Sequence, residues 1–126
     1  MNITNSAISL NVPDEEASAA FLERHLGFER EMQQDGFVAL RREGVGFNVI
    51  FLRTGLSTFK PASHSGSAGP GLLLVFVVDD IDAEWRLLTA AGAPVATPIE
   101  TEPWGERYFQ IIDPNGVLLQ FVQWVS

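Results

Sequence analysis

The feature that most constrains the fold of this chain is a strand–aspartate–helix–glycine unit that occurs twice, about half a chain length apart. In the first copy, residues 8–12 alternate between apolar and polar side chains, which predicts a half-buried strand. Asp14 follows as a helix cap, and apolar residues at helical spacing predict a helix over residues 15–26 that ends at Gly27. A unit that recurs in this order favours an α+β domain built from two similar halves.

The second copy has the same order. The apolar run at residues 72–78 predicts a strand buried on both faces, Asp80 follows it, and residues 82–91 predict a helix that ends at Gly92. After each helix, strand-like segments separated by turn residues predict three further strands, at 28–33, 37–41 and 46–52, and at 95–97, 107–112 and 117–125. The chain is thus predicted to be one domain of two βαβββ modules, at residues 1–54 and 72–126, with a Ser-, Gly- and Pro-rich linker at 55–71.

Composition narrows the class of function. Sixteen acidic residues against eight basic ones give a net charge of −8, which repels a phosphate backbone and argues against nucleic acid as a partner. The absence of cysteine excludes disulfides, thiolate metal ligands and a cysteine nucleophile. No apolar run approaches the roughly 18 residues of a membrane helix, and the N-terminus shows no secretory signal. A cytoplasmic protein without membrane contact is expected.

Several short motifs carry a resemblance to a known family. In the first half they are Val12-Pro13-Asp14, Phe21 and Leu26-Gly27-Phe28. In the second half they are the run at 77–82, Ala91-Gly92-Ala93, Pro103-Trp104-Gly105 and Asp113-Pro114-Asn115-Gly116. In this order and spacing, the chain resembles the vicinal-oxygen-chelate superfamily of glyoxalase I, bleomycin-resistance proteins, fosfomycin-resistance enzymes and extradiol dioxygenases, over nearly its whole length.

The resemblance implies a vicinal-oxygen-chelate fold, in which the two βαβββ modules form curled mixed sheets around a shared cavity. Members commonly dimerise, and some exchange strands or modules. A homodimer is therefore expected, either with or without exchanged strands or modules. The metal enzymes of the family place four ligands of the types His, Glu and Gln on that cavity. Matched residue by residue, those positions in this chain are Ala7, Asn48, Leu73 and Gln120.

This donor set departs from the metal-binding pattern. Ala7 and Leu73 carry no donor atom, and neutral amide oxygens such as those of Asn48 and Gln120 bind divalent metals poorly by themselves. A catalytic zinc takes about three protein ligands of the His, Glu, Asp or Cys type. The two histidines, at 25 and 64, fall outside the four positions. We therefore expect no metal and no other cofactor.

Strand alternation predicts which other side chains share the cavity face. The turn at residues 113–116 is predicted to pair Ile112 with Val117. In that register, Phe109 faces Gln120 and Arg107 faces Val122, and both lie on the cavity side.

Trp104 lies in a loop between Pro103 and Gly105, where it is a candidate lid that stacks on a flat ligand; the alternative is a loop anchor packed on the body of the protein. The predicted ligand-binding residues are mostly apolar, as in small-molecule pockets generally. They are Asn48, Ile50, Leu73, Val75, Trp104, Arg107, Phe109, Gln120 and Val122. None of them is predicted to be catalytic.

These observations predict a metal-free small-molecule-binding protein of the glyoxalase/bleomycin-resistance type, which sequesters an aromatic or apolar natural product such as an antibiotic. The alternative is a glyoxalase-like lyase or isomerase, or a dioxygenase-like enzyme of the same superfamily. The sequence contains neither a phosphate-binding loop nor a GxSxG nucleophile motif, so neither of these motifs points to a different function.

Overall fold

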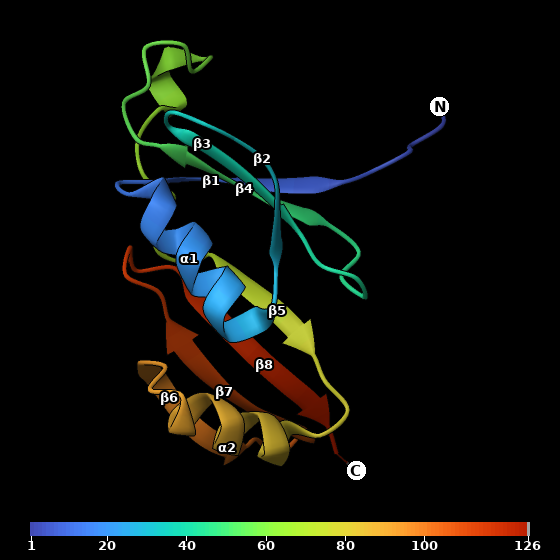
Figure 1. Ribbon diagram of the computed structural model, residues 1–126. Helices are drawn as coiled ribbons and strands as arrows, with labels where there is room; N and C mark the ends of the chain where they lie inside the picture. The colour runs from blue at the N-terminus through green and yellow to red at the C-terminus, as the bar shows by residue number, and fades with distance from the viewer. Residues whose placement is uncertain (126) are drawn as a thin grey trace. The chain divides into compact units, whose positions relative to one another are not determined.

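A computed structural model describes residues 1–125 of the chain and divides it into two compact units, Met1–Pro70 and Gly71–Ser126. Each unit contains one four-stranded mixed sheet and one α-helix, the α+β architecture that the duplicated sequence unit predicts (Figure 1). The first unit comprises β1 (Ala7–Val12), α1 (Glu15–Leu26), β2 (Glu29–Gln34), β3 (Phe37–Arg41), β4 (Asn48–Arg53) and the short 3-10 helix η1 (Ala62–His64). The second comprises β5 (Leu73–Val77), α2 (Ile81–Ala90), β6 (Val95–Thr101), β7 (Glu106–Ile112) and β8 (Leu118–Trp124).

The two sheets have the same topology. Their strand orders are β1-β4-β3-β2 and β5-β8-β7-β6, with the first pair parallel and the other pairs antiparallel. In each unit the helix follows the first strand and packs against the central strands: α1 against β3 and β4, and α2 against β7 and β8. The repeated βαβββ order is therefore confirmed.

The predicted helix caps are present in both units. The Asp14 carboxylate accepts a hydrogen bond from the Ala17 backbone N–H at 3.1 Å, and Gly27 ends α1 in the left-handed conformation, at φ 71°. In the second unit, Asp80 accepts from the Ala83 N–H at 3.1 Å. These contacts satisfy N–H groups that the first turn of a helix leaves without a partner, so each helix starts at a defined residue.

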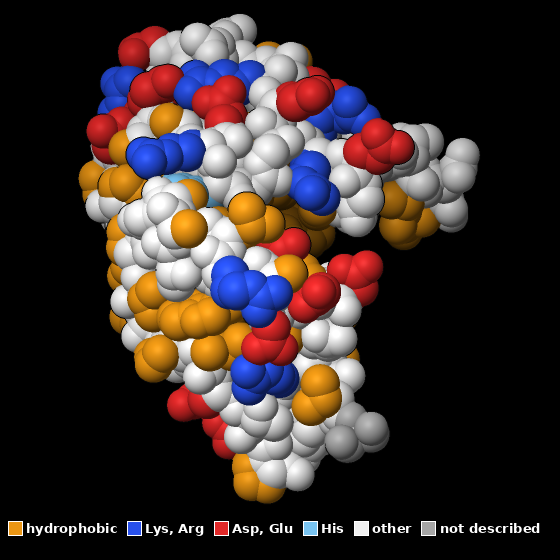
Figure 2. Space-filling view, turned by 60° about the horizontal axis from the view of Figure 1, so that its bottom comes forward, with side chains coloured by type: hydrophobic (Ala, Val, Ile, Leu, Met, Phe, Trp, Pro, Cys, Tyr) orange, Lys and Arg blue, Asp and Glu red, His pale blue; other side chains and the backbone are white. Residues whose placement is uncertain are grey.

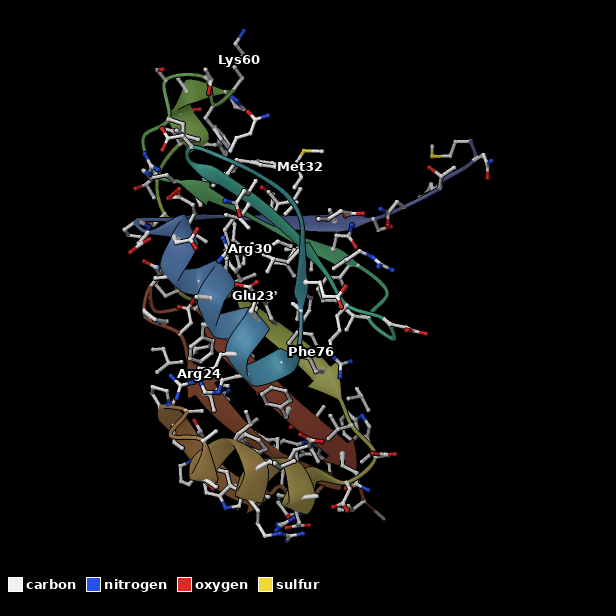
Figure 3. The ribbon with its side chains drawn as sticks, viewed as in Figure 1. Glu23, Arg24, Arg30, Met32, Lys60 and Phe76 are labelled. Atoms are coloured by element: carbon white, nitrogen blue, oxygen red, sulfur yellow. The ribbon has the colours of Figure 1, made fainter. Side chains whose placement is uncertain are left out.

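Ion pairs connect α1 to the sheet of the first unit. The buried carboxylate of Glu15 accepts two hydrogen bonds from the Arg53 guanidinium of β4, at 2.9 and 2.8 Å, and these bonds lower its pKa. Arg53 also donates to Asp35 at 2.8 Å. From β2, Arg30 points to α1 and pairs with Glu23 at 2.9 Å (Figure 3). The bidentate contact to Glu15 sets the position of the first helical turn on the sheet.

The segment between the predicted modules is anchored to the first unit. The Asn11 side chain donates to the carbonyl oxygens of His64 and Gly66, at 2.8 and 3.0 Å. The Ala68 N–H donates to the Asn11 carbonyl oxygen at 2.9 Å. Residues 55–70 therefore fold onto the end of β1 and belong to the same compact unit.

The core of the second unit lies between its sheet and α2. Leu74, Leu119 and Phe121 are buried there. Phe109 is fully buried with them: its ring stacks on Phe121 at 5.2 Å between centroids and meets Trp85 of α2 edge-on at 5.1 Å. Aromatic pairs at these spacings add to the stabilisation from burial.

The predicted pairing of β7 with β8 is wrong by one residue. Ile112 pairs with Leu118, and Asp113 pairs with Val117 instead. The cause lies in the turn, where the Asp113 carboxylate accepts from the backbone N–H groups of Asn115 and Val117, at 2.9 and 2.8 Å. Because Val117 is held by Asp113, the first strand pair moves one residue along β8, and a shift of one residue exchanges the two faces of a strand.

This register corrects two predicted site residues. Phe109 lies opposite Phe121 rather than Gln120, and Arg107 lies opposite Gln123 rather than Val122. Both side chains therefore occupy the face that α2 covers. Arg107 pairs there with Asp82 of α2 at 2.7 Å, so it joins helix to sheet.

Candidate functional site

Each unit has one candidate face, which is the side of its sheet that points away from its helix. In the first sheet the matched positions Ala7 and Asn48 are direct partners across β1 and β4. Asn48 alternates with the buried Val49, which places it on the face opposite α1, and Ile50 follows on the same face. The Asn48 amide donates to the Glu31 carboxylate at 3.0 Å, so this amide already has an anionic partner.

In the second sheet the other two matched positions are diagonal neighbours. Leu73 pairs with Leu118, and Gln120 pairs with Val75. Leu73, Val75 and Val77 are 39, 43 and 66% exposed along β5, whereas Val122 on β8 is buried. The face opposite α2 thus carries a row of exposed aliphatic side chains beside the Gln120 amide.

These residues do not fit a catalytic transition metal. Ala7 and Leu73 have no donor atoms, and the Gln120 oxygen already accepts a hydrogen bond from Gln110 at 2.8 Å. Within residues 1–125, no group of three or more His, Cys, Asp or Glu side chains is arranged to hold a metal ion. His25 lies on α1, with its ring 4.6 Å from that of Phe21, and burial lowers its pKa.

A hydrogen-bonded row of polar side chains crosses the face opposite α2. The Thr97 hydroxyl of β6 donates to the Gln110 oxygen of β7 at 2.8 Å, and the Gln110 amide donates to the Gln120 oxygen of β8 at 2.8 Å. Gln110 and Gln120 are direct partners in the β7–β8 register. The sequence prediction missed Gln110 because the shifted register assigned it to the helix side.

A second polar cluster on this face was also missed. The Tyr108 hydroxyl lies between the carboxylates of Glu100, on β6, and Glu102, just after this strand, at 2.7 and 2.9 Å. Its hydrogen bonding to these two anions raises the pKa of Tyr108, because losing the proton would place a third negative charge beside them. Tyr108 pairs with Val122, so the correct β7 alternation identifies it.

Trp104 lies in the loop between β6 and β7 and is 67% exposed. Trp124, at the end of β8, is also exposed. Trp124 is opposite Glu106 in the β7–β8 register. The Val125 N–H donates to the Gly105 carbonyl at 2.7 Å, which ties the Trp104 loop to the end of β8. Gly105 has φ 92°, and a Cβ there would collide with the Val125 carbonyl oxygen, so glycine is required for this approach.

The face of the protein in Figure 2 shows no basic patch of the kind that binds nucleic acid. Acidic side chains are scattered there among basic ones, with hydrophobic groups between them and no continuous basic patch. The part of the chain that the structure describes contains no helix with the length and hydropathy needed to cross a bilayer.

Comparison with known proteins gives a match over most of the chain. A sequence profile described as the Glyoxalase/Bleomycin resistance protein/Dioxygenase superfamily matches residues 5–121. Uncharacterized proteins of Mycobacterium bovis and Mycobacterium tuberculosis are 33% identical over 57 residues, which is 45% of this chain and 38 and 34% of theirs. The matched part thus spans little more than a third of the length of these curated relatives.

Solved structures resemble this one over most of their length. A glyoxalase/bleomycin resistance protein/dioxygenase from Nocardioides has a TM-score of 0.80 at 23% identity, covering 100% of this chain and 86% of that one. TioX from Micromonospora sp. ML1 has a TM-score of 0.74 at 25% identity, covering 98 and 100%. Lactoylglutathione lyase from Agrobacterium tumefaciens has a TM-score of 0.77 at 21% identity, covering 97 and 94%. At these identities the likeness establishes a shared fold, and the fold does not by itself assign a function.

Proposed function

Since this chain belongs to the glyoxalase/bleomycin resistance protein/dioxygenase superfamily, we propose that it is a metal-free member that binds a small molecule without transforming it. The observation that carries the proposal is the donor set at the four matched positions. Two are aliphatic, and the Asn48 and Gln120 amides each have a protein partner. These four residues therefore do not supply the three or so protein donor atoms that a catalytic metal requires.

The chemistry of the face opposite α2 supports an aromatic or apolar ligand, such as an antibiotic or another natural product. Exposed Leu73 and Val75 offer aliphatic contacts beside a few oriented polar groups, the mixture typical of small-molecule sites. Trp104 adds an exposed ring at one end of the same unit. Binding transfers this apolar surface out of water, which supplies the main driving force.

The first prediction concerns metal. The purified chain is expected to bind flat aromatic compounds equally well before and after dialysis against a chelator, and to contain no stoichiometric zinc, nickel, iron or manganese. Elemental analysis and calorimetric titration with a panel of aromatic natural products measure both quantities. Stoichiometric metal that restores turnover of a thiol-adduct or catechol substrate would contradict the proposal and favour the enzyme alternative.

The second prediction concerns Trp104. Replacing it by alanine is expected to weaken binding of an aromatic hit from that panel by about 1–3 kcal/mol, the usual effect of losing an aromatic anchor. The fold should persist because the side chain is largely exposed. Calorimetry gives the affinity, and circular dichroism checks the fold. Unfolding of Trp104→Ala at room temperature would instead make this residue a loop anchor.

The third prediction concerns assembly. We propose a two-fold homodimer, because β5 is an edge strand with exposed apolar side chains, and such edges are normally covered. Light scattering is expected to give about twice the chain mass of 13.8 kDa. Val77→Lys should shift the mass toward the monomer, whereas Gln34→Lys on β2 should not. A mass near 13.8 kDa for the unmodified chain at micromolar concentration would contradict the dimer.

A further inference from the structure

Gln120 combines deep burial with a position in the middle of the candidate face. It lies on the central strand β8 and is 8% exposed. Its direct neighbours across the sheet are Val75 on β5 and Gln110 on β7. One side of this amide is therefore aliphatic and partly open, and the other side is polar.

The polar side determines which end of the amide remains available. The Thr97 hydroxyl donates to the Gln110 oxygen, which leaves the Gln110 nitrogen as a donor. That nitrogen donates to the Gln120 oxygen, at 2.8 Å. Each bond in this row runs in the same direction, and a side-chain amide has one oxygen and two N–H donors. The oxygen end of Gln120 is therefore engaged.

The nitrogen end of Gln120 has no protein acceptor among residues 1–125. Among residues 1–125, the one fully buried side-chain polar atom without a partner is His25 Nδ1, so the Gln120 nitrogen keeps contact with solvent and can donate to water or to a bound molecule. The side chains of the neighbouring Val75 and the flanking Val122 have no acceptor atom. The acceptor for this N–H therefore comes from water or from a molecule bound on this face.

Resting on the proposed function, we infer that Gln120 donates an amide N–H to an acceptor oxygen of the bound molecule, so that the ligand class is flat, apolar compounds carrying a carbonyl group. The ring system lies over the aliphatic side chains of β5, and the carbonyl oxygen points to the Gln120 nitrogen. Thr97 and Gln110 act as positioning residues that hold the amide in the donating orientation. The same orientation disfavours a cation, because N–H groups face it.

The test uses 1-indanone and indane, flat bicyclic probes that differ in one carbonyl group. Dissociation constants for both are measured by ¹⁵N-HSQC titration of the full chain, with the side-chain amide signals of Gln120 as a direct report. The variant is Gln120→Glu, which keeps an oxygen to accept from Gln110 but replaces the outward N–H groups by a second oxygen. Gln34→Glu, on an exposed position of β2, makes the same chemical change in the first unit and is the matched control.

The deciding quantity is the dissociation constant of indane divided by that of indanone. The two probes also differ in hydrophobicity, but this difference cancels when the ratio is compared between the unmodified chain and a variant. Gln120→Glu is expected to lower this ratio about three- to tenfold, the usual effect of one hydrogen bond, and Gln34→Glu to leave it unchanged. In the unmodified chain, indanone but not indane should move the Gln120 amide signals downfield. If Gln120→Glu does not fold, Gln120→Met provides the same comparison.

The outcomes separate the two proposals. If both probes bind and the ratio is the same in the unmodified chain and the variant, the Gln120 inference is overturned while small-molecule binding stands. If neither probe, at millimolar concentration, shifts any signal from β5 or β8, the proposed function fails on this face and the inference fails with it.

Discussion

Replacing Phe109 by alanine is expected to lower the free energy of unfolding by about 3–5 kcal/mol, the range for removing a large aromatic side chain from a core. Its ring is fully buried between Trp85 of α2 and Phe121 of β8, so truncation leaves a cavity that both neighbours border. The rigid sheet on one side prevents the site from collapsing around the smaller side chain. Urea unfolding followed by circular dichroism measures the change.

Two comparisons make this prediction specific. Trp104→Ala removes a larger but exposed aromatic side chain from the same unit and should change the free energy of unfolding by less than about 1 kcal/mol. Phe109→Leu should recover much of the loss, since it restores most of the buried volume. A Phe109→Ala variant that unfolds at the same urea concentration as the unmodified chain would show that Phe109 lies on the open face instead.

Replacing Asp113 by alanine is expected to lower the free energy of unfolding by about 2–3 kcal/mol. The buried Asp113 carboxylate accepts from the N–H groups of Asn115 and Val117, and its removal leaves these donors without that acceptor. Each unsatisfied buried donor costs about 1–3 kcal/mol, and part of this is recovered by water at the turn.

Asp113→Asn is the matched control, because its amide oxygen can accept the same two hydrogen bonds. We expect it to retain most of the stability. Hydrogen exchange provides the second measurement: in Asp113→Ala the amides of the β7–β8 pair nearest the turn should exchange faster than those of β3–β4. Equal stability of the alanine and asparagine variants would contradict the role of this carboxylate in holding the turn.

The elements with local signals were predictable from the sequence. Asp14 and Asp80 cap their helices through N–H groups three residues along the chain, and Gly27 adopts the left-handed conformation directly after α1. These contacts join residues that are close in sequence, so residue type and spacing are sufficient to indicate them. The apolar run at 72–78 gave no such signal: it predicted a strand buried on both faces, whereas Leu74 is buried and Leu73, Val75 and Val77 on the face opposite α2 are exposed.

Strand irregularities were not predictable in this way. β6 continues to Thr101, past Pro98, because it is an edge strand whose pairing with β7 is interrupted by two register shifts. Proline is tolerated at such positions since no ladder hydrogen bond depends on its nitrogen. A further shift in β2, between Arg30 and Met32, accompanies the contact of Glu31 with Asn48.

The anchoring of residues 55–70 also required the tertiary structure. Their composition is typical of a linker, and no local pattern indicates a partner. Asn11, which lies more than 50 positions earlier, supplies two hydrogen bonds to carbonyl oxygens of this segment. Such contacts depend on where the end of β1 lies after folding.

For the candidate site, too, the sequence determined one part and the tertiary structure another. The amino-acid types at Ala7, Asn48, Leu73 and Gln120 are enough to argue against a metal centre, because a side chain without a donor atom cannot ligate in any conformation. Which residues accompany Gln120 was decided by the register of β7 on β8. The Asp113 turn moves that register by one residue, which places Phe109 in the core and brings Gln110 beside Gln120. Sequence alternation specifies that two faces exist, whereas long-range hydrogen bonding between strands decides which residues meet on each face.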